Sequence, residues 1–398
     1  MKLDLSANHV RITLSSFLAY FVMSSVISPL GIVTQPIADH YGIEVTTATA
    51  IFSYLTTGIL GGTFLAMFVY SVLSLRAVTM LASLILIASM LSAWLIDLFS
   101  LLPILLALIG VTSGLLLSAA IVVLTHSYSE RARAPALLVT DSFYSGAGVI
   151  SGWTSGLLIE RGYHWGSTYA LAIAATTLLL IIVLVSRYPS GKSEAPGRGT
   201  SDSQESWPPG VFVVAAALFV YILSFVFIYS WVPNYAAEAM QSSPEQGGTL
   251  VSRFFLGLFV GQVAMFALVF KIDIRWLISG TACLAALASC GLWLAGDYKA
   301  LLLWMFALGF LSGGLLKTLI TYGTMMVSNP SPRLVGFFIF SPAFGTSLAP
   351  AVSALIVEAW GTRAILIALT AGYTMVAGLV LVAVALKRSS MRVATEAG

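Results

Sequence analysis

The sequence predicts an all-α membrane protein with twelve transmembrane helices in two pseudo-symmetric six-helix halves, and three observations lead to that fold class. Hydrophobic residues make up 59% of the 398 residues and charged residues only 9%, whereas soluble globular domains carry about 25% charged residues. Apolar runs of about 20 residues, the length that crosses a bilayer, recur along the whole chain. One polar stretch, SRYPSGKSEAPGRGTSDSQESWPPG, separates two sets of six runs.

Each apolar run is expected to form one membrane-spanning helix. The first run is too long and too polar at its flanks for a cleaved signal peptide, so we expect it to remain as a membrane helix. The runs lie near residues 11–36, 46–70, 77–96, 101–125, 135–158, 165–187, 210–236, 247–270, 276–295, 300–327, 333–357 and 363–386.

The polar stretch between the sixth and seventh runs is rich in Gly, Ser, Pro and mixed charge. This composition predicts a flexible cytoplasmic linker. We therefore predict an N-terminal half at residues 1–187, a linker at 188–209 and a C-terminal half at 210–398.

Basic residues lie mainly on one side of the predicted helices. If the N-terminus is cytoplasmic, 14 of the 19 Lys and Arg fall on the cytoplasmic side. The five others are Arg161, Lys299 and Arg363 outside, with Arg253 and Lys317 inside membrane runs. Because cytoplasmic loops carry an excess of Lys and Arg, the distribution predicts a multi-pass protein of the cytoplasmic (inner) membrane with both termini in the cytoplasm.

The two predicted halves resemble one another in sequence. IGVTSGLLLS (109–118) and LGFLSGGLLK (308–317) share Gly, Ser and Gly at a constant offset of 199 residues. With a small gap, SGLLIERGYHWGS (155–167) parallels SALIVEAWGT (353–362). Helix four thus matches helix ten, and helices five and six match eleven and twelve.

Three further motifs carry a resemblance to a known family: IADHYG (37–42), VTDSFYSGAG (139–148) and YSWVPNYA (229–236). The chain resembles a transporter of the major facilitator superfamily over essentially its whole length, and more narrowly the fucose-proton symporter type branch with its TsgA-like members. The resemblance implies alternating access, with a substrate site between the two halves near the midplane.

Two departures from the family pattern bear on function. Helix one has no acidic residue between Arg11 and Asp39, where sugar symporters of the fucose type carry one, and the loop after helix two keeps only Arg76 of the usual Gly, Asp and basic residues. The resemblance favours proton-coupled uptake of a small polar or anionic solute. The departures leave proton-driven efflux open as the alternative.

Lys317 is the charge that lies deepest in an apolar run. It is about nine residues, or about 13 Å of helix, from the nearer end at Ser328. It continues the row Gly309, Gly313 at helical spacing, so it shares a face with two small residues. Since the resemblance places helices four and ten at the central cavity, we predict that Lys317 binds substrate, with Ser118 as its counterpart. A structural ion pair is the alternative.

Asp141 is the second intramembrane charge. It lies six residues beyond Pro135, and Ser145 and Gly148 follow on the same helical face. We predict that Asp141 carries a coupling proton, or forms a gate with Lys317 when the cytoplasmic side is closed. The alternative is an Asp bonded to neighbouring hydroxyls or to Arg131 or Arg133.

Arg253 is the third intramembrane charge and begins a row with Gly257 and Gly261. One turn of helix brings it to the outer interface, so we expect a structural charge that reaches the surface or pairs with Glu238 or Glu245.

Aromatic and amide residues of helices one and seven are expected to line the substrate site. Pro233 predicts a hinge or unwound segment among them; Pro29, Pro342 and Pro350 are candidates for the same role. An interfacial aromatic belt and packing are the alternative, which we favour for Trp231 and Tyr235 because they lie near the outer surface. The full set of predicted substrate-binding residues is Lys317, Tyr20, Gln35, Tyr221, Tyr229, Asn234 and Ser118.

Other function classes find little support in the sequence. His9, His40, His126 and His164 lie at span ends on both sides of the membrane, so they cannot form one metal site. No phosphate-binding loop ending in Lys and Ser or Thr is present, so we expect no cofactor, no catalytic residue and a proton gradient as energy source. A net charge of +3 is too small to suggest nucleic acid. We expect a monomer in the lipid bilayer; a ligand receptor that does not transport is the second hypothesis.

Overall fold

The computed structural model describes residues 7–96, 98–128, 130–188, 207–327 and 331–396, and the regular structure in these ranges is helical throughout. The predicted all-α fold is therefore confirmed. The chain forms two compact units. Unit 1 comprises Met1–Pro196 with Val232–Ser252, and unit 2 comprises Gly197–Trp231 with Arg253–Gly398. A short segment from the second half of the sequence thus belongs to the unit built by the first half.

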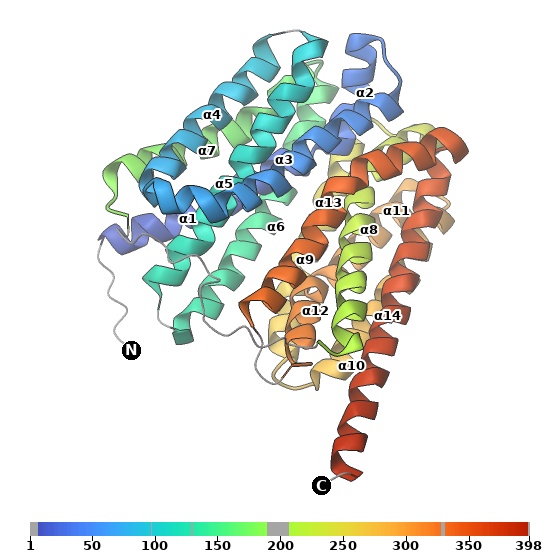
Figure 1. The fold of residues 1–398 in the computed structure, drawn as a ribbon. Coiled ribbons are helices and arrows are strands. Elements are labelled where there is room, and N and C mark those ends of the chain that lie inside the picture. Colours follow the sequence, from blue (N-terminus) through green and yellow to red (C-terminus); the bar gives the residue numbers. More distant parts are fainter. Residues whose placement is uncertain (1–6, 97, 129, 189–206, 328–330, 397–398) are drawn as a thin grey trace. The chain divides into compact units, whose positions relative to one another are not determined.

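Unit 1 is a helical bundle (Figure 1). Helix α1 packs on α5, α6 and α7, while α3 packs on α5 and α4 packs on α5 and α7. Two short 3₁₀ helices, η1 and η2, precede α5 and α7. The elements are α1 (Ala7–Ile27), α2 (Leu30–Tyr41), α3 (Val45–Val72), α4 (Leu75–Leu95), η1 (Phe99–Leu101), α5 (Leu102–Ser127), α6 (Glu130–Glu160), η2 (Trp165–Tyr169) and α7 (Ala170–Val185).

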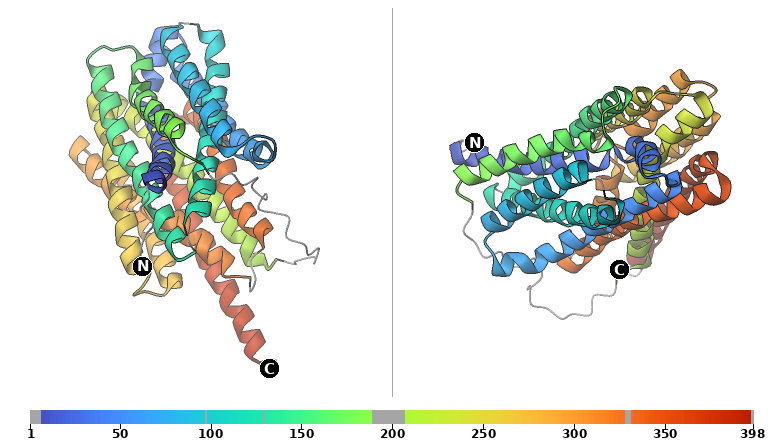
Figure 2. Two further views of the ribbon diagram at one scale, coloured as in Figure 1. Left: turned by 90° about the vertical axis from the view of Figure 1, so that its left-hand side faces the viewer. Right: turned by 90° about the horizontal axis from the view of Figure 1, so that it is seen from above.

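Unit 2 contains the remaining helices, except that the last turns of α8 and the first turns of α9 belong to unit 1. Helix α10 packs on α11, α12 and α14, and α13 packs on α12 and α14. The C-terminal turns of α14 extend beyond the neighbouring helices of this unit (Figures 1 and 2). The elements are α8 (Pro209–Met240), α9 (Pro244–Leu268), α10 (Ile274–Leu294), α11 (Tyr298–Ser312), α12 (Leu315–Thr324), α13 (Pro332–Trp360) and α14 (Thr362–Glu396).

Eleven helical segments within the described ranges are long and apolar enough to cross a membrane. The fifth predicted span, 135–158, falls on α6 and is not among them. Helix α6 has 31 residues, ample to cross a bilayer of about 30 Å, but its sequence opens with ERARAP and includes Asp141, so it is less apolar than the other spans.

Prolines affect the helices differently from the sequence prediction. Pro29 does separate α1 from α2, because the chain turns at Ser28 and Pro29 before helix resumes at Leu30. In contrast, α8 runs without interruption through Pro233, and α13 runs through both Pro342 and Pro350. The chain is therefore not unwound at these three prolines, and a hinge there stays a prediction.

Glycines allow two pairs of helices to touch backbone to backbone. In unit 1, a Cβ added at Gly58 would lie 2.5 Å from the Ala107 carbonyl oxygen, and one added at Gly62 would meet the Val111 carbonyl. Gly110 and Gly114 of α5 meet the α3 backbone in the same way. Side chains at these positions would push α3 and α5 apart, so glycine is required for this packing.

The same interface recurs in unit 2 between α9 and α11. Gly257 and Gly261 lie against the carbonyls of Phe306 and Phe310, and α11 contributes two further glycines. All four positions follow from unit 1 by adding 199 residues: Gly58, Gly62, Gly110 and Gly114 correspond to Gly257, Gly261, Gly309 and Gly313.

The repeats differ directly after this interface. In unit 1, α5 continues past Gly114 to Ser127. In unit 2, α11 ends at Ser312, the chain turns at Gly313 and Gly314, and α12 begins at Leu315. The single predicted run 300–327 is therefore two helices, with the break two residues before Lys317.

Candidate functional site

Asp141 lies on α6, beside α1. Its side chain is half-buried, while its neighbour Thr140 is fully buried. The side chains of Tyr20 and Thr140 are hydrogen-bonded, and the Asp141 carboxylate interacts electrostatically with the hydroxyls of Tyr20 and Tyr144. The structure thus brings together Tyr20, predicted to bind substrate, and Asp141, predicted to carry a proton. The carboxylate has two phenols nearby, one from each helix.

Packing between α1 and α6 fixes this arrangement. The rings of Phe17 and Phe143 lie 4.8 Å apart, and the Ser151 hydroxyl donates a 3.1 Å hydrogen bond to the Ser25 carbonyl. The Ser145 hydroxyl donates to the backbone carbonyl of Asp141 at 3.0 Å. Two contacts on either side of Tyr20 therefore hold it at the level of Asp141. The side chains of Arg131 and Arg133, the alternative partners of Asp141, lie outside the described part of the chain.

Lys317 is the third residue of α12 and is exposed. The opposite face of α12 is buried in unit 2 through Leu315, Leu319 and Tyr322. Gly309 and Gly313 lie against the backbone of α9, and the helix break separates them from Lys317. The shared face that the spacing predicts therefore does not follow from one continuous helix. Its repeat counterpart Ser118 is half-buried on the continuous helix α5.

Tyr221 of α8 stabilises the helix break before Lys317. Its hydroxyl donates a 3.0 Å hydrogen bond to the carbonyl of Ser312, the last residue of α11. The Ser312 hydroxyl is in turn 3.0 Å from the Tyr373 hydroxyl of α14. Because Tyr221 is buried and bonded to backbone, its observed contacts are structural and position the segment that carries Lys317.

The other aromatic residues of α8 lie in the core. Tyr229 is buried beside Phe225 and Phe255, with ring centroids 5.9 Å and 6.2 Å away. Trp231 and Tyr235 are also buried, with 0% and 7% of their surface exposed. Packing, which the sequence analysis favoured for Trp231 and Tyr235, is therefore observed, whereas exposure of the two rings in an interfacial belt is not.

The segment 232–252 packs on α2 and α6 of unit 1. The Asn234 amide donates a 2.8 Å hydrogen bond to the Thr34 hydroxyl of α2. Gly156 of α6 lies so close to α9 that an added Cβ would be 2.6 Å from the Pro244 carbonyl and 3.0 Å from the Gly248 Cα. Asn234, predicted to bind substrate, thus contacts α2 directly.

The two remaining predicted site residues, Gln35 and Arg253, have exposed side chains. Gln35 of α2 is exposed, and its amide donates a 2.7 Å hydrogen bond to the Asp39 carboxylate. Arg253 of α9 is exposed, and its role as a structural charge stays a prediction.

Histidines approach one another in one place. The rings of His40 and His164 lie 5.0 Å apart, and the His164 Nδ1 accepts a hydrogen bond from the Gly166 backbone. Among the residues that the structure describes, no group of three or more His, Cys, Asp or Glu side chains is arranged to hold a metal ion.

Polar side chains of α1 and α4 form hydrogen bonds with the backbone at the end of α7. Arg76 donates a 2.7 Å hydrogen bond to the Leu184 carbonyl, and Asn8 both donates to and accepts from the backbone of Arg187. Arg76, the one basic residue kept from the family's loop, therefore has a capping role here.

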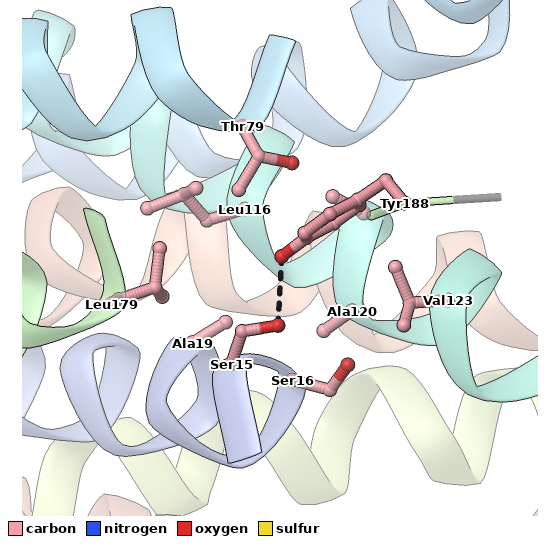
Figure 3. A pocket seen from close by; sticks show the side chains of 10 residues that line it. Ser15, Ser16, Ala19, Thr79, Leu116, Ala120, Val123, Leu179 and Tyr188 are labelled. Atoms are coloured by element: carbon pink, nitrogen blue, oxygen red, sulfur yellow. Dashed lines mark hydrogen bonds between the residues drawn. The ribbon is translucent and has the colours of Figure 1, made fainter. Parts of the chain in front are cut away.

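Tyr188 folds back over a small cavity in unit 1 (Figure 3). Its hydroxyl is 2.7 Å from that of Ser15, and the cavity of about 10 Å³ beneath it is close to the volume that one water molecule needs. Burial raises the pKa of Tyr188 to about 12. The predicted linker therefore begins with a residue that is attached to unit 1. Most of that linker, residues 189–206, lies outside the described residues.

Sequence reasoning missed Thr140, Tyr144 and Thr34. Tyr144 lies three residues after Asp141, so helical spacing could have placed both on one face. Thr34 and Thr140 could not be found this way, because their partners come from distant parts of the chain.

Comparisons with known proteins agree with this architecture. The family model of the Major Facilitator Superfamily matches residues 12–235. Protein TsgA of Shigella flexneri is 29% identical over 371 residues, which cover 93% of this chain and 94% of the relative. Protein TsgA of Escherichia coli O9:H4 (strain HS) matches with the same identity and coverage.

Solved structures of transporters share the fold. A bacterial homolog of the human lysosomal transporter Spinster has a TM-score of 0.71 at 14% identity and covers 97% of each chain. The fucose transporter FucP scores 0.65 at 15% identity, over 94% of this chain and 98% of its own. The nucleoside transporter NupG scores 0.72 at 13% identity, over 94% and 99%. The chain therefore belongs to the Major Facilitator Superfamily and is a transporter with multiple membrane-spanning helices.

Proposed function

We propose that this protein takes up a small polar or anionic solute across the cytoplasmic membrane in symport with protons. The observation that carries the proposal is the Asp141 carboxylate, half-buried on α6 with the hydroxyls of Tyr20 and Tyr144 nearby. An ionisable side chain within a membrane protein is a functional candidate, because an isolated charge there is costly. Both termini are cytoplasmic in this proposal, and the protein acts as a monomer.

Asp141 is the proton carrier in this proposal. A carboxylate with hydroxyl groups nearby has polar partners in both its charged and its neutral form. It therefore binds and releases a proton without a large rearrangement. Symport also agrees with one fold relative, FucP, the fucose:proton symporter of E. coli.

Lys317 is the substrate anchor. Its side chain is exposed on α12, directly after the helix break between α11 and α12. A cation at this position favours a substrate with a carboxylate, a phosphate or several hydroxyl oxygens. We propose Ser118, Gln35, Asn234 and Tyr229 as secondary substrate contacts.

Transport by purified protein in proteoliposomes tests the proposal. With Asp141→Asn, exchange of labelled solute across the membrane continues while accumulation driven by a proton gradient stops. Glu160→Gln is the matched control, because Glu160 is another carboxylate of α6, at its end. Accumulation by Asp141→Asn at the wild-type rate would exclude Asp141 as the carrier.

Lys317→Ala separates binding from folding. We expect transport to be lost while the melting temperature stays within a few degrees of the wild type, since Lys317 is exposed. Wild-type transport by the alanine variant would remove Lys317 from the site. Binding of solute without any accumulation in wild-type vesicles would instead favour the receptor hypothesis, and accumulation only in inverted vesicles would favour efflux.

The predicted gate between Asp141 and Lys317 needs its own test. If the two charges interact when the cytoplasmic side is closed, removing both should change the populations of the two states by less than the sum of the single changes. Distance labels at the predicted cytoplasmic ends of helices four and ten, which are the ends of α5 and α12, report those populations. Strict additivity would assign Lys317 another partner.

A further inference from the structure

The beginning of α10 holds an ion pair with unusual geometry. Asp273 is the residue before the helix and accepts a 2.9 Å hydrogen bond from the backbone of Arg275. The Arg275 guanidinium also donates to both carboxylate oxygens, at 3.0 Å and 2.7 Å. These hydrogen bonds hold the pKa of Asp273 at about 2. Arg275 is thereby fixed in place with two of its five N–H donors directed at Asp273.

Lys387 of α14 lies next to this pair. Its ammonium nitrogen is 5.0 Å from the centre of the Tyr322 ring, a cation–π contact, and its charge interacts with the charges of both Arg275 and Asp273. Two cations and one carboxylate therefore share this location, and Lys271 lies two residues before Asp273. The local charge is positive even with Asp273 ionised.

The surroundings are those of a lipid-facing surface. Phe270 and Trp276, which flank Asp273 and Arg275 in sequence, are 75% and 65% exposed. Exposed large apolar side chains in a membrane protein face acyl chains, and aromatic residues gather at the depth of the headgroups. The cluster of Arg275 and Lys387 thus lies where apolar surface gives way to charge.

At the equivalent position in unit 1, the arginine side chain donates its hydrogen bond to a different acceptor. Arg76 is 199 residues before Arg275 and also follows the first residue of its helix, α4. Arg76 donates to the Leu184 carbonyl at the end of α7. In unit 2, α14 continues to Glu396, whereas α7 of unit 1 ends at Val185. Arg275 meets a second cation instead.

We propose that Arg275 and Lys387 bind the phosphate of an anionic phospholipid. A phosphate oxygen offers acceptors to the remaining guanidinium donors and to the ammonium group, and it relieves the repulsion between the two cations. The acyl chains cover the exposed apolar surface around Phe270 and Trp276. The site is independent of the substrate and of the coupling ion.

Lipid retention in native mass spectrometry tests the site. Purified protein is given phosphatidylglycerol, phosphatidylethanolamine or inorganic phosphate in the same detergent. We expect the wild type to retain phosphatidylglycerol at least several-fold better than phosphatidylethanolamine. The variant Arg275→Gln with Lys387→Gln loses this preference, whereas Lys299→Gln, which removes a lysine near the start of α11, keeps it.

A second variant protects the test from a folding failure. Asp273→Asn removes the carboxylate that competes for Arg275, so retention of phosphatidylglycerol should rise above that of the wild type. Damage to the fold would lower retention instead. Equal retention of the two lipids by the wild type, or no change in both variants, would overturn the proposal. If the protein retains inorganic phosphate as well as it retains phosphatidylglycerol, the site binds free phosphate. That result would also overturn the proposal.

Discussion

The two repeats of this transporter share a helix interface and differ in the segment directly after it. Each repeat has four glycines at this interface, and each glycine of the first repeat has a counterpart 199 residues later in the second. They bring α3 against α5 and α9 against α11. Beyond them, unit 1 has an uninterrupted helix with Ser118, whereas unit 2 has a break and then Lys317. Backbone contact therefore determines the scaffold that both repeats share. The charged candidate residues differ between the repeats: Asp141 lies on α6 in unit 1 and Lys317 on α12 in unit 2.

The largest effect should come from breaking the shared interface. Gly62→Val and Gly261→Val each place a side chain against a backbone carbonyl, of Val111 and Phe310 respectively. Because backbone cannot move aside as a flexible side chain does, we expect a loss above the about 1–3 kcal/mol that overpacking usually costs. Thermal unfolding in detergent measures it.

Glycines with open space around them provide controls for this prediction. Gly61 in unit 1 and Gly280 in unit 2 have no atom within 4 Å of an added Cβ. Gly61→Ala and Gly280→Ala should leave the melting temperature nearly unchanged. If Gly62→Val and Gly261→Val differ strongly from each other, the two interfaces are not equivalent despite the shared spacing.

The next largest effect should come from exchanging Ser118 and Lys317, the equivalent residues that follow the glycine interface in the two repeats. Ser118→Lys introduces a half-buried charge into a continuous helix, and we expect it to destabilise unit 1 by about 2.5–3.5 kcal/mol. Lys317→Ser removes an exposed charge and should barely change stability. The melting temperatures of the two variants compare them directly. Equal losses would mean that the helix break does not make room for Lys317.

A smaller effect is expected where the arginines Arg76 and Arg275 differ. Arg76→Gln removes the hydrogen bond to the Leu184 carbonyl, so we expect a loss of about 0.5–1.5 kcal/mol. Amide exchange should become faster at the end of α7. Arg275→Gln should leave exchange in α14 unchanged, and faster exchange there would contradict the difference between the repeats.

The smallest effect concerns pH. The folded-state pKa of Asp273, about 2, is lower than its usual value because Arg275 donates to its carboxylate. The stabilisation that this pair contributes is therefore fully present above the usual Asp pKa of about 3.9 and is lost as the pH falls through about 2. Titration of the carboxyl carbon by NMR, assigned with Asp273→Asn, measures it. Ser74, the equivalent residue of unit 1, does not titrate. A midpoint near 4 would contradict the ion pair.

Much of the fold could be predicted because long apolar runs are a strong signal in any one sequence. The pairing of Gly110 and Gly114 with Gly309 and Gly313 was also visible as a constant offset. The break before Lys317 was not predicted, because Gly313 and Gly314 lie in a run whose hydropathy does not change. Pro233 was expected to allow a break in α8, but α8 is continuous there although proline lacks the N–H of the helix hydrogen bond.

The candidate site was predicted residue by residue rather than as an arrangement. Asp141 and Lys317 were found because a charge in an apolar run is conspicuous. The contacts of Tyr20 with Thr140 and Asp141 were not, because they depend on the rotation of α1 against α6. Packing of Trp231 and Tyr235 was expected, but the residues that cover them were not, because position along a helix does not reveal its neighbours.

The membership of residues 232–252 in unit 1 has a consequence for how the protein is made. A nascent chain that has reached Tyr188 has all seven helices of the first half, but it lacks the partners of Thr34 on α2 and Gly156 on α6. Those partners, Asn234 and Gly248, leave the ribosome only after the linker and most of α8. The first unit cannot complete its packing until synthesis has passed Ser252. Insertion of the two halves is therefore coupled in time, and a truncated N-terminal half should engage chaperones or membrane proteases that the full chain avoids.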